Sequence, residues 1–187
     1  MRVIGGYLKG KKLYQPMDLK TRPLKDIVKE SIFNILTHSK DNKINFNNAN
    51  ILDLFSGSGS FGIECLSRGA QIVYFFENYK NTLKILYKNI NNLDLDRKVK
   101  IVEKSVFELK NINFGNAKFE IIFIDPPFLN NDLDKIINEI SFLKITKPDT
   151  VVIIHRNKKT KDEINEKFSI LREKIFGLSK LYFGRIT

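Results

Sequence analysis

The sequence predicts an α/β protein built on a mainly parallel β-sheet with helices on both faces. Three observations lead to this fold class. From Asn50 onward, short runs of β-branched and aromatic residues alternate with segments of helical spacing. The runs are apolar throughout, as in Phe119–Ile124, which is typical of strands buried on both faces. The first run ends in a turn rich in glycine and serine, so the ligand-binding edge of such a sheet is expected there.

The expected elements follow one another in a regular order. Strands are predicted at the apolar runs, and helices where apolar residues recur every three or four positions. The predicted strands span residues 51–55, 71–76, 99–102, 119–124 and 150–155, with two closing strands at 170–176 and 181–186. The predicted helices span residues 60–67, 79–91, 132–142 and 161–168.

A shorter N-terminal part precedes this alternation. Residues 2–14 contain two alternating stretches around glycines and lysines and predict a β-hairpin with a basic turn. Thr21-Arg22-Pro23 is expected to open a helix, because proline suits the first helical turn. Residues 40–50 are polar and rich in asparagine, and are the expected linker. We therefore divide the chain into an N-terminal hairpin and helix extension, residues 1–45, and a main domain, residues 46–187.

Composition excludes several classes of protein. With 187 residues, of which 42% are hydrophobic, the chain can bury a core, so a wholly disordered protein is excluded. The single cysteine, Cys65, excludes an intramolecular disulfide and a multi-cysteine zinc site, and is expected to be a buried thiol. His38 and His155 are the only histidines and are expected to be surface or capping groups, so no metal site is predicted. Without a signal peptide or a membrane-length apolar run, a cytoplasmic protein is expected.

The net charge of +11 is concentrated near the N-terminus. Residues 1–43 hold ten Lys and Arg against four acidic residues, whereas the other 144 residues hold 22 against 17. Such an excess predicts a surface that contacts a polyanion, most often RNA or DNA. The alternative is compositional drift, since the chain is rich in Lys, Asn and Ile.

The glycine-rich turn predicts a site for a nucleoside-containing cofactor. Gly57, Gly59 and Gly62 form a G-x-G-x-x-G pattern between a strand and a helix, where backbone can approach a ligand closely. Glu77, at the end of the second strand, can accept both hydroxyls of a ribose. Spacing alone does not exclude NAD, while ATP chemistry is disfavoured because no Gly-Lys-Ser/Thr follows the loop. Asp53, just before the loop, favours S-adenosylmethionine (SAM), whose ammonium group needs a negative neighbour.

The sequence Asp125-Pro126-Pro127-Phe128 follows the fourth predicted strand and suggests the substrate. An exocyclic base amine is a poor nucleophile because its lone pair is delocalised into the ring. The Asp125 carboxylate and the Pro126 carbonyl can bind its two N–H groups, and the prolines hold these acceptors in place beforehand. Phe128 can stack on the base. Ser105 and Val106 follow the third strand, where an adenine contact is expected.

Taken together, these residues resemble the RsmD-like family of 16S rRNA (guanine-N2)-methyltransferases. The resemblance extends over nearly the whole chain. It is carried by residues 6–13, Thr21-Arg22-Pro23, residues 28–34, residues 52–59, Gly62-Ile63-Glu64, residues 66–70, Glu77, Asp125-Pro126-Pro127-Phe128 and, more weakly, Tyr182-Phe183-Gly184.

The resemblance implies a Rossmann-like, seven-stranded SAM-dependent methyltransferase domain that methylates N2 of one guanine in the small ribosomal subunit or its assembly intermediate. The protein is then expected to act as a monomer without metal. The target guanine would lie at Asp125, Pro126, Pro127 and Phe128, and the rRNA phosphates at Lys9, Lys11, Lys12 and Arg22. The cofactor would be bound by Arg22, Glu30, Asn34, Asp53, Phe55, Ser56, Gly57, Ser58, Gly59, Glu77, Ser105 and Val106.

The chain departs from the family pattern at Leu24, Ile27 and Ser105-Val106, which affects the details of adenine and RNA contact. Three other functions compete with guanine methylation. A methyltransferase for another exocyclic amine, such as DNA adenine N6, would use a similar turn, but the chain lacks a long target-recognition insertion. An RNA-binding assembly factor with lost catalysis would not need Asp53, Glu77 and Asp125 intact. A nicotinamide dehydrogenase would need an acid/base pair beside the loop.

Overall fold

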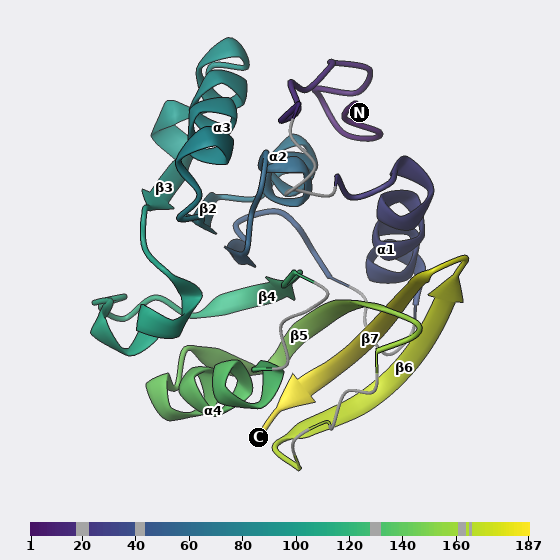
Figure 1. Ribbon diagram of the computed structural model, residues 1–187, viewed down its shortest axis with the longest axis vertical. Coiled ribbons are helices and arrows are strands. Elements are labelled where there is room, and N and C mark those ends of the chain that lie inside the picture. The colour runs from purple at the N-terminus through teal and green to yellow at the C-terminus, as the bar shows by residue number, and fades with distance from the viewer. Residues whose placement is uncertain (18–22, 40–43, 128–131, 161–163, 165) are drawn as a thin grey trace.

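The computed structural model describes residues 1–17, 23–39, 44–127, 132–160, 164 and 166–187. A seven-stranded sheet forms its centre, with the strand order β3-β2-β1-β4-β5-β7-β6 (Figure 1). Strands β1 to β5 run parallel, and β7 is antiparallel to both of its neighbours, β5 and β6. The strands are β1 (Asn50–Leu54), β2 (Ile72–Phe76), β3 (Val99–Val102), β4 (Phe119–Ile124), β5 (Thr146–Asn157), β6 (Phe168–Phe176) and β7 (Ser179–Ile186). The predicted fold class is therefore confirmed.

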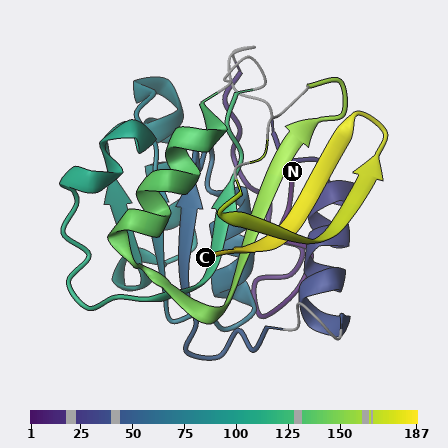
Figure 2. The same cartoon turned by 90° about the horizontal axis from the view of Figure 1, so that it is seen from below.

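Helices cover both faces of the sheet, as Figures 1 and 2 show. Helices α1 (Asp26–His38), α2 (Ser60–Ser67) and α3 (Lys80–Asn92) bury their apolar residues in one core cluster with one face of the sheet. The 3-10 helix η2 (Val106–Asn111) and α4 (Leu133–Leu143) pack on the other face. A short 3-10 helix, η1 (Asp96–Lys98), precedes β3.

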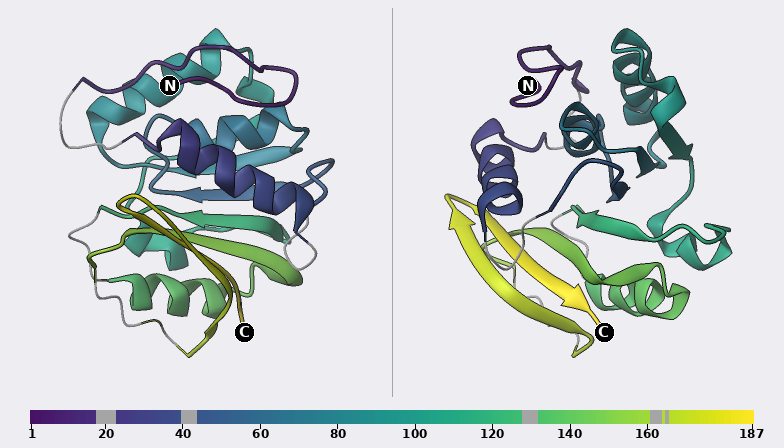
Figure 3. Two further views of the ribbon diagram at one scale, coloured as in Figure 1. Left: turned by 90° about the vertical axis from the view of Figure 1, so that its right-hand side faces the viewer. Right: turned by 180° about the vertical axis from the view of Figure 1, so that it is seen from behind.

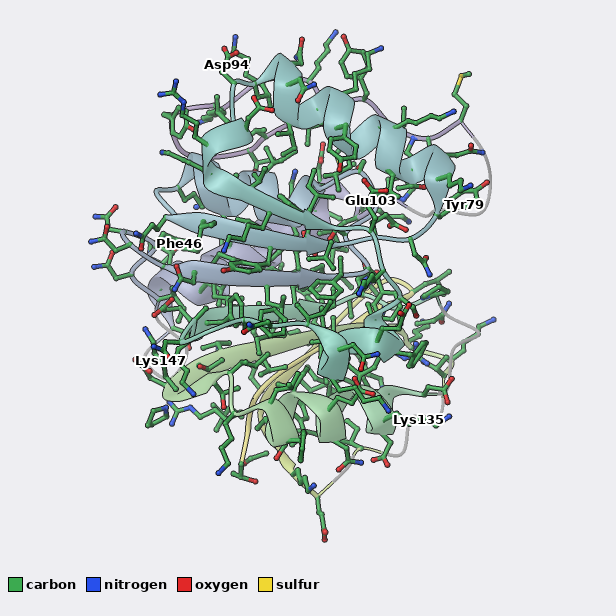
Figure 4. All side chains as sticks on the ribbon, turned by 90° about the vertical axis from the view of Figure 1, so that its left-hand side faces the viewer. Phe46, Tyr79, Asp94, Glu103, Lys135 and Lys147 are labelled. Atoms are coloured by element: carbon green, nitrogen blue, oxygen red, sulfur yellow. The ribbon has the colours of Figure 1, made fainter. Side chains whose placement is uncertain are left out.

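Parallel strands bring their carboxyl ends to one edge of the sheet. In β1, Ile51 packs in the core of α1, α2 and α3, and Leu52 packs in the core of α4 and η2, so the strand is buried on both faces. Figure 4 shows Tyr79 and Glu103, which follow β2 and β3, on the side opposite to Phe46 and Lys147. The turns after β1, β2, β3 and β4 consequently lie at a common edge, which we call the carboxyl edge.

The N-terminal segment forms a loop that lies over α2 (Figure 3) instead of a regular hairpin. A single antiparallel bridge joins Arg2 to Lys12, and the loop turns at residues 5–10. Ser67 fixes it to α2, because its hydroxyl accepts from Leu8 N–H and donates to the Gly5 carbonyl. Gly6 has φ +71°, and a Cβ there would lie 1.8 Å from the Ser67 carbonyl oxygen. Any side chain at position 6 would therefore displace the loop.

A buried charge network joins the same loop to α1 and α2. The Lys29 ammonium donates to the Arg2 carbonyl at 2.6 Å and lies 3.7 Å from a carboxylate oxygen of Glu64. Glu64 also accepts from Ile4 N–H and from Arg68 Nε. Lys29 and Glu64 are fully buried, and burial lowers the pKa of Lys29 while the charge of Glu64 opposes that shift. The network therefore satisfies two charges that would otherwise be costly to bury.

Besides the N-terminal hairpin, two expected elements differ from the structure. The helix predicted at 161–168 is wrong in its described part, because residues 166 and 167 form a turn and Phe168 begins β6. Helix α1 begins at Asp26, so Pro23 precedes it and does not form its first turn. In the expected linker, Phe46 and Ala49 are buried, with Phe46 packed against Phe33, whereas Asn45, Asn47 and Asn48 are exposed. Within the described ranges, no helix is long and apolar enough to cross a membrane.

Candidate active site at the carboxyl edge

The glycine loop between β1 and α2 has a fixed backbone. Phe55, Gly57 and Gly59 have φ angles of +62°, +56° and +81°, which place all three in the left-handed region. The hydroxyl of Ser56 donates to the carbonyl of Asp53 at 2.6 Å and to that of Phe76 at 3.1 Å, so the loop is joined to the ends of β1 and β2. Two features favour glycine at position 59: its left-handed backbone, and the close approach of Leu86, from which a Cβ would lie only 2.5 Å away. These hydrogen bonds and the packing against Leu86 fix the course of the loop.

Glu77 joins the glycine loop to the β2–α3 turn. One carboxylate oxygen accepts from Gly57 N–H at 2.9 Å, and the other accepts from the N–H groups of Asn78 and Tyr79, also at 2.9 Å. Three backbone donors thus orient a carboxylate that is only half-buried. Because two carboxylate oxygens can accept about four hydrogen bonds, Glu77 retains capacity for a ligand hydroxyl.

Asp53 lies beneath the loop and is 1% exposed. Its Oδ2 accepts from Gly62 N–H at 3.0 Å, in the first turn of α2. Burial raises the pKa of Asp53 well above its ordinary value, the Gly62 hydrogen bond opposes this shift, and the charges of Asp125 and Glu77 raise the pKa further. The structure therefore brings Asp125 and Glu77 close enough to Asp53 for their charges to act on its carboxyl group. A cation at the carboxyl edge would oppose this effect.

The Asp125-Pro126-Pro127 segment leaves β4 beside the end of β1. Asp125 N–H donates to the carbonyl of Leu54 at 3.3 Å, which holds the start of the turn next to the glycine loop. The Asp125 side chain is 20% exposed, so its carboxylate is accessible from outside. Phe128 lies outside the described residues, and its stacking role stays a prediction.

Two residues of β5 that the sequence analysis did not assign to the site contact this turn. The sequence analysis expected His155 to be a surface or capping group, and this expectation was wrong. His155 is buried, and its Nδ1 lies 2.8 Å from Asp125 Oδ1. Arg156 is fully buried, and its Nη1 donates to the Pro127 carbonyl at 3.4 Å. The apolar run at residues 151–154 located the strand, but nothing in it indicated that His155 would contact Asp125, 30 residues earlier in the chain. Cys65 is buried as predicted, and burial raises its pKa well above the ordinary value.

Ser105 and Val106 lie after β3, as predicted, at the start of η2. The Ser105 hydroxyl accepts from Phe107 N–H, and Glu108 accepts from Ser105 N–H, which together form a capping box. Phe107 lies across from Phe55 of the glycine loop, with ring centroids 6.5 Å apart. The structure thus brings the β3 turn and the glycine loop together through an aromatic pair that the sequence analysis missed.

Glu30 and Asn34 lie elsewhere. Both are exposed on α1 and line a groove of about 870 Å³ between α1 and β6, where Arg172 and Lys174 are their neighbours. No residue of the glycine loop lines this groove. Their assignment to the cofactor stays a prediction, and Arg22 lies outside the described residues.

Lys9, Lys11 and Lys12 are exposed on the N-terminal loop, and aromatic residues accompany them. Tyr14 is 43% exposed, and the Lys88 ammonium of α3 lies 3.7 Å from the centroid of its ring. Exposed lysines beside aromatic rings are typical of surfaces that bind single-stranded nucleic acid. The basic surface therefore extends from the loop onto α3.

The comparison with known proteins follows from this geometry. Residues 1–185 match the family described as "Conserved hypothetical protein 95". Ribosomal RNA small subunit methyltransferase D of Haemophilus influenzae is 30% identical over 95% of this chain and 90% of its own length. The protein of the same name from Buchnera aphidicola subsp. Acyrthosiphon pisum is 30% identical over 96% of this chain and 90% of its own length.

The chain belongs to this RsmD family. Among solved structures, the candidate methyltransferase yhhF of Escherichia coli superposes with a TM-score of 0.81 at 26% identity, covering 100% of this chain and 97% of that one. A more distant candidate methyltransferase, SMU.776, was solved in complex with SAH and shares the fold, with a TM-score of 0.63 at 18% identity over 84% of this chain and 49% of that one. RsmD membership confirms the prediction of a SAM-dependent methyltransferase.

The residues at the carboxyl edge of this RsmD-family protein fit SAM. The cofactor carries a sulfonium and an ammonium, and at this edge Asp53 lies near enough to Asp125 and Glu77 for their negative charges to raise its pKa. Glu77 offers acceptor capacity toward a ribose, and the backbone of the glycine loop allows close approach. Within the described part of the chain, no three His, Cys, Asp or Glu side chains gather as a metal site.

Proposed function

We propose that this chain transfers a methyl group from SAM to the exocyclic N2 of a guanine in small-subunit (16S) ribosomal RNA. The observation that carries the proposal is the place of Asp125. Its carboxylate is partly exposed at the end of β4, and its backbone is joined to the end of β1, from which the glycine loop departs. An acceptor of base N–H groups therefore lies next to the predicted cofactor loop. The names of the RsmD relatives, which are small-subunit rRNA methyltransferases, support rRNA as the substrate.

The chain's own residues bind and orient the reactants. Bound SAM supplies an electrophilic methyl group on its sulfonium. Asp53 and Glu77 provide negative charge and hydroxyl acceptors for the cofactor. Asp125 and the Pro126 carbonyl accept the two N–H groups of the guanine amine and direct its lone pair toward the methyl group. As the N–C bond forms, the C–S electron pair stays on sulfur, and the excess proton on nitrogen passes to Asp125 or to water.

The remaining site residues and partners belong to the same proposal. Pro127 and Phe128 complete the guanine site, and Phe55, Ser56, Gly57, Ser58 and Gly59, with Ser105 and Val106, surround SAM. Lys9, Lys11 and Lys12, with Arg22, bind rRNA phosphates, so residues 1–45 act as the RNA-contacting extension of the domain at 46–187. Glu30 and Asn34 are assigned to the cofactor from the family resemblance alone, since in this structure both line the groove between α1 and β6. The enzyme works as a cytoplasmic monomer on the small subunit or its assembly intermediate.

The test uses SAM with a tritiated methyl group and small ribosomal subunits from cells that lack the enzyme. Nucleoside analysis identifies the labelled atom, and naked 16S rRNA is assayed in parallel. Label in N2-methylguanosine is the expected result. Label in another nucleoside, or in DNA adenine, would overturn the guanine assignment while retaining methyl transfer. Absence of label from every substrate, despite measurable SAM binding, would favour an assembly factor without catalysis.

A further inference from the structure

The strand β5 supplies side chains to the turn that receives the target base. Strands β4 and β5 are parallel, and their register pairs Ile124 with Ile154. Asp125 directly follows β4 and His155 is the next residue of β5, so both side chains continue the strand alternation toward the same face of the sheet. Nδ1 of the histidine lies 2.8 Å from Oδ1 of the aspartate. This contact is a consequence of strand register, and therefore has a fixed geometry.

The two partners differ in their access to solvent. The His155 side chain is 8% exposed, whereas that of Asp125 is 20% exposed. The histidine therefore approaches the carboxylate from the protein side. Arg156, the next residue along β5, is fully buried and donates to the Pro127 carbonyl. Two consecutive residues of one strand thus hold a side chain and a carbonyl of the Asp125-Pro126-Pro127 turn.

Orientation of the carboxylate limits the proposed chemistry. A free aspartate rotates about two side-chain torsions, and misplacing a reacting group by about 1 Å can cost about 100-fold in rate. A hydrogen bond to Oδ1 removes that freedom and leaves Oδ2 for the guanine amine. We propose that His155 is a positioning residue for methyl transfer, which holds Oδ1 of Asp125 so that Oδ2 faces the acceptor amine. This role rests on the proposed function.

The charge on the histidine bears on how it can be tested. Burial by itself would lower the pKa of His155, but the charge of Asp125 and the hydrogen bond to it outweigh burial and raise the pKa, while the charge of Arg156 opposes them. The protonated ring donates from Nδ1. The neutral ring still donates from Nδ1, because the carboxylate selects that tautomer, but the hydrogen bond loses the charge that strengthens it. Methyl transfer should therefore slow as the pH rises through the pKa of His155.

The first experiment separates positioning from folding. His155→Leu removes the donor, and His155→Asn places an amide N–H near the position of Nδ1. We expect His155→Leu to lower kcat about 10- to 100-fold, with the Kd of SAM and the melting temperature little changed. His155→Asn should recover most of the activity and lose the fall of kcat at high pH. Equal kcat values and pH profiles in the three proteins would overturn the proposal.

The second experiment measures the pair without any substrate. The chain has only two histidines, so ¹⁵N-histidine NMR resolves His155 with exposed His38 as an internal control. Asp125→Asn should lower the pKa of His155, because it removes the charge that raises that pKa. An unchanged His155 pKa would overturn the contact itself. If the wild-type protein labels another nucleoside, the guanine assignment is overturned, and the role of His155 is then tested by comparing the same variants on that nucleoside. If the wild-type protein transfers no methyl group to any substrate, both proposals are overturned.

Discussion

The side chain of Asn89 holds the backbone of Tyr14 through two hydrogen bonds. Its Oδ1 accepts from Tyr14 N–H at 2.8 Å, and its Nδ2 donates to the Tyr14 carbonyl at 3.0 Å. The same Nδ2 donates to the carbonyl of Ser58 at 2.9 Å. Asn89 lies on α3 and is 1% exposed. One buried amide therefore connects the basic N-terminal loop to the glycine loop.

We expect Asn89→Leu to weaken both binding surfaces together. Leucine has a similar size but leaves the N–H of Tyr14 and the carbonyls of Tyr14 and Ser58 without their side-chain partner. The free energy of unfolding should fall by about 1–3 kcal/mol, and the Kd values for SAM and rRNA should both rise. Urea unfolding and calorimetric titration measure these changes. Asn91→Leu, at an exposed position on the same helix, is the control; a matching response in both variants would refute the connecting role.

The sequence was sufficient for those parts of the site that depend on local structure. The glycine loop and the Asp125 turn each follow a strand recognisable from its apolar run, and the structure pairs these two strands, β1 and β4, side by side. Glu77 was likewise placed by the end of β2. In a parallel sheet, these positions meet at one edge whatever the details of packing.

Contacts that depend on distant packing could not be predicted in this way. His155 meets Asp125 only because β4 and β5 pair in one register. Lys29 belongs to α1 and is fully buried, with Arg2 of the N-terminal loop and Ser60 and Glu64 of α2 around its ammonium, although a lysine usually indicates a solvent-exposed position. The helix predicted at 161–168 failed because an apolar pattern as short as Ile164 and Phe168 fits a helix or a strand, and Phe168 pairs with Ile186 in the sheet.

We expect Asp53→Asn to increase the stability of the fold and to weaken SAM binding. The pKa of Asp53 is raised mainly by burial, with the charges of Asp125 and Glu77 adding to it. The folded protein therefore holds this proton more tightly than the unfolded chain, and the free energy of unfolding declines as the pH rises from about 3.9 through the raised pKa. An asparagine carbonyl can still accept from Gly62 N–H without that charge. At neutral pH the free energy of unfolding of the variant should be about 1 kcal/mol higher than that of the wild type, as measured by urea denaturation.

Affinity for SAM gives the second half of this prediction. A bound cation favours ionised Asp53, so SAM binding to the wild type should strengthen with pH until Asp53 is ionised in the free protein. Asp53→Asn should bind SAM about tenfold more weakly and lose that pH dependence. Titration calorimetry in buffers of different ionisation enthalpy would detect the released proton. Unaltered affinity and proton release in the variant would exclude Asp53 as the neighbour of the cofactor's charge.

Replacing Lys9, Lys11 and Lys12 with glutamine should weaken rRNA binding and flatten its dependence on salt. Each lysine that contacts a phosphate releases condensed counterions, which contributes a slope of about −0.7 to −0.9 to log K against log salt. We expect the slope for the triple variant to be smaller in magnitude by about 2, with no change in SAM affinity. Fluorescence titrations at several salt concentrations measure the slope.

The control for this variant replaces Lys118, Lys144 and Lys147 with glutamine. These residues lie near the amino ends of β4 and β5, away from the carboxyl edge, as the position of Lys147 in Figure 4 shows. The net charge changes equally in both triple variants, so a general electrostatic effect would reduce both slopes alike. That result would mean that the N-terminal lysines act through the overall charge of the protein and do not contact phosphates.

Asp125→Ala should remove methyl transfer while leaving cofactor binding intact. The lost carboxylate accepts from the target amine, so it acts on the transition state more than on bound SAM. Removing one preorganised polar group of this kind lowers kcat about 100- to 1000-fold, and the Kd of SAM should change less than about threefold. Tritium transfer under single-turnover conditions measures the rate, with calorimetry for SAM. Asp149→Ala removes an exposed carboxylate of β5 and should retain full activity. Full activity of Asp125→Ala would move the acceptor role to another group, whereas equal losses of SAM affinity and rate would mean that Asp125 supports the cofactor.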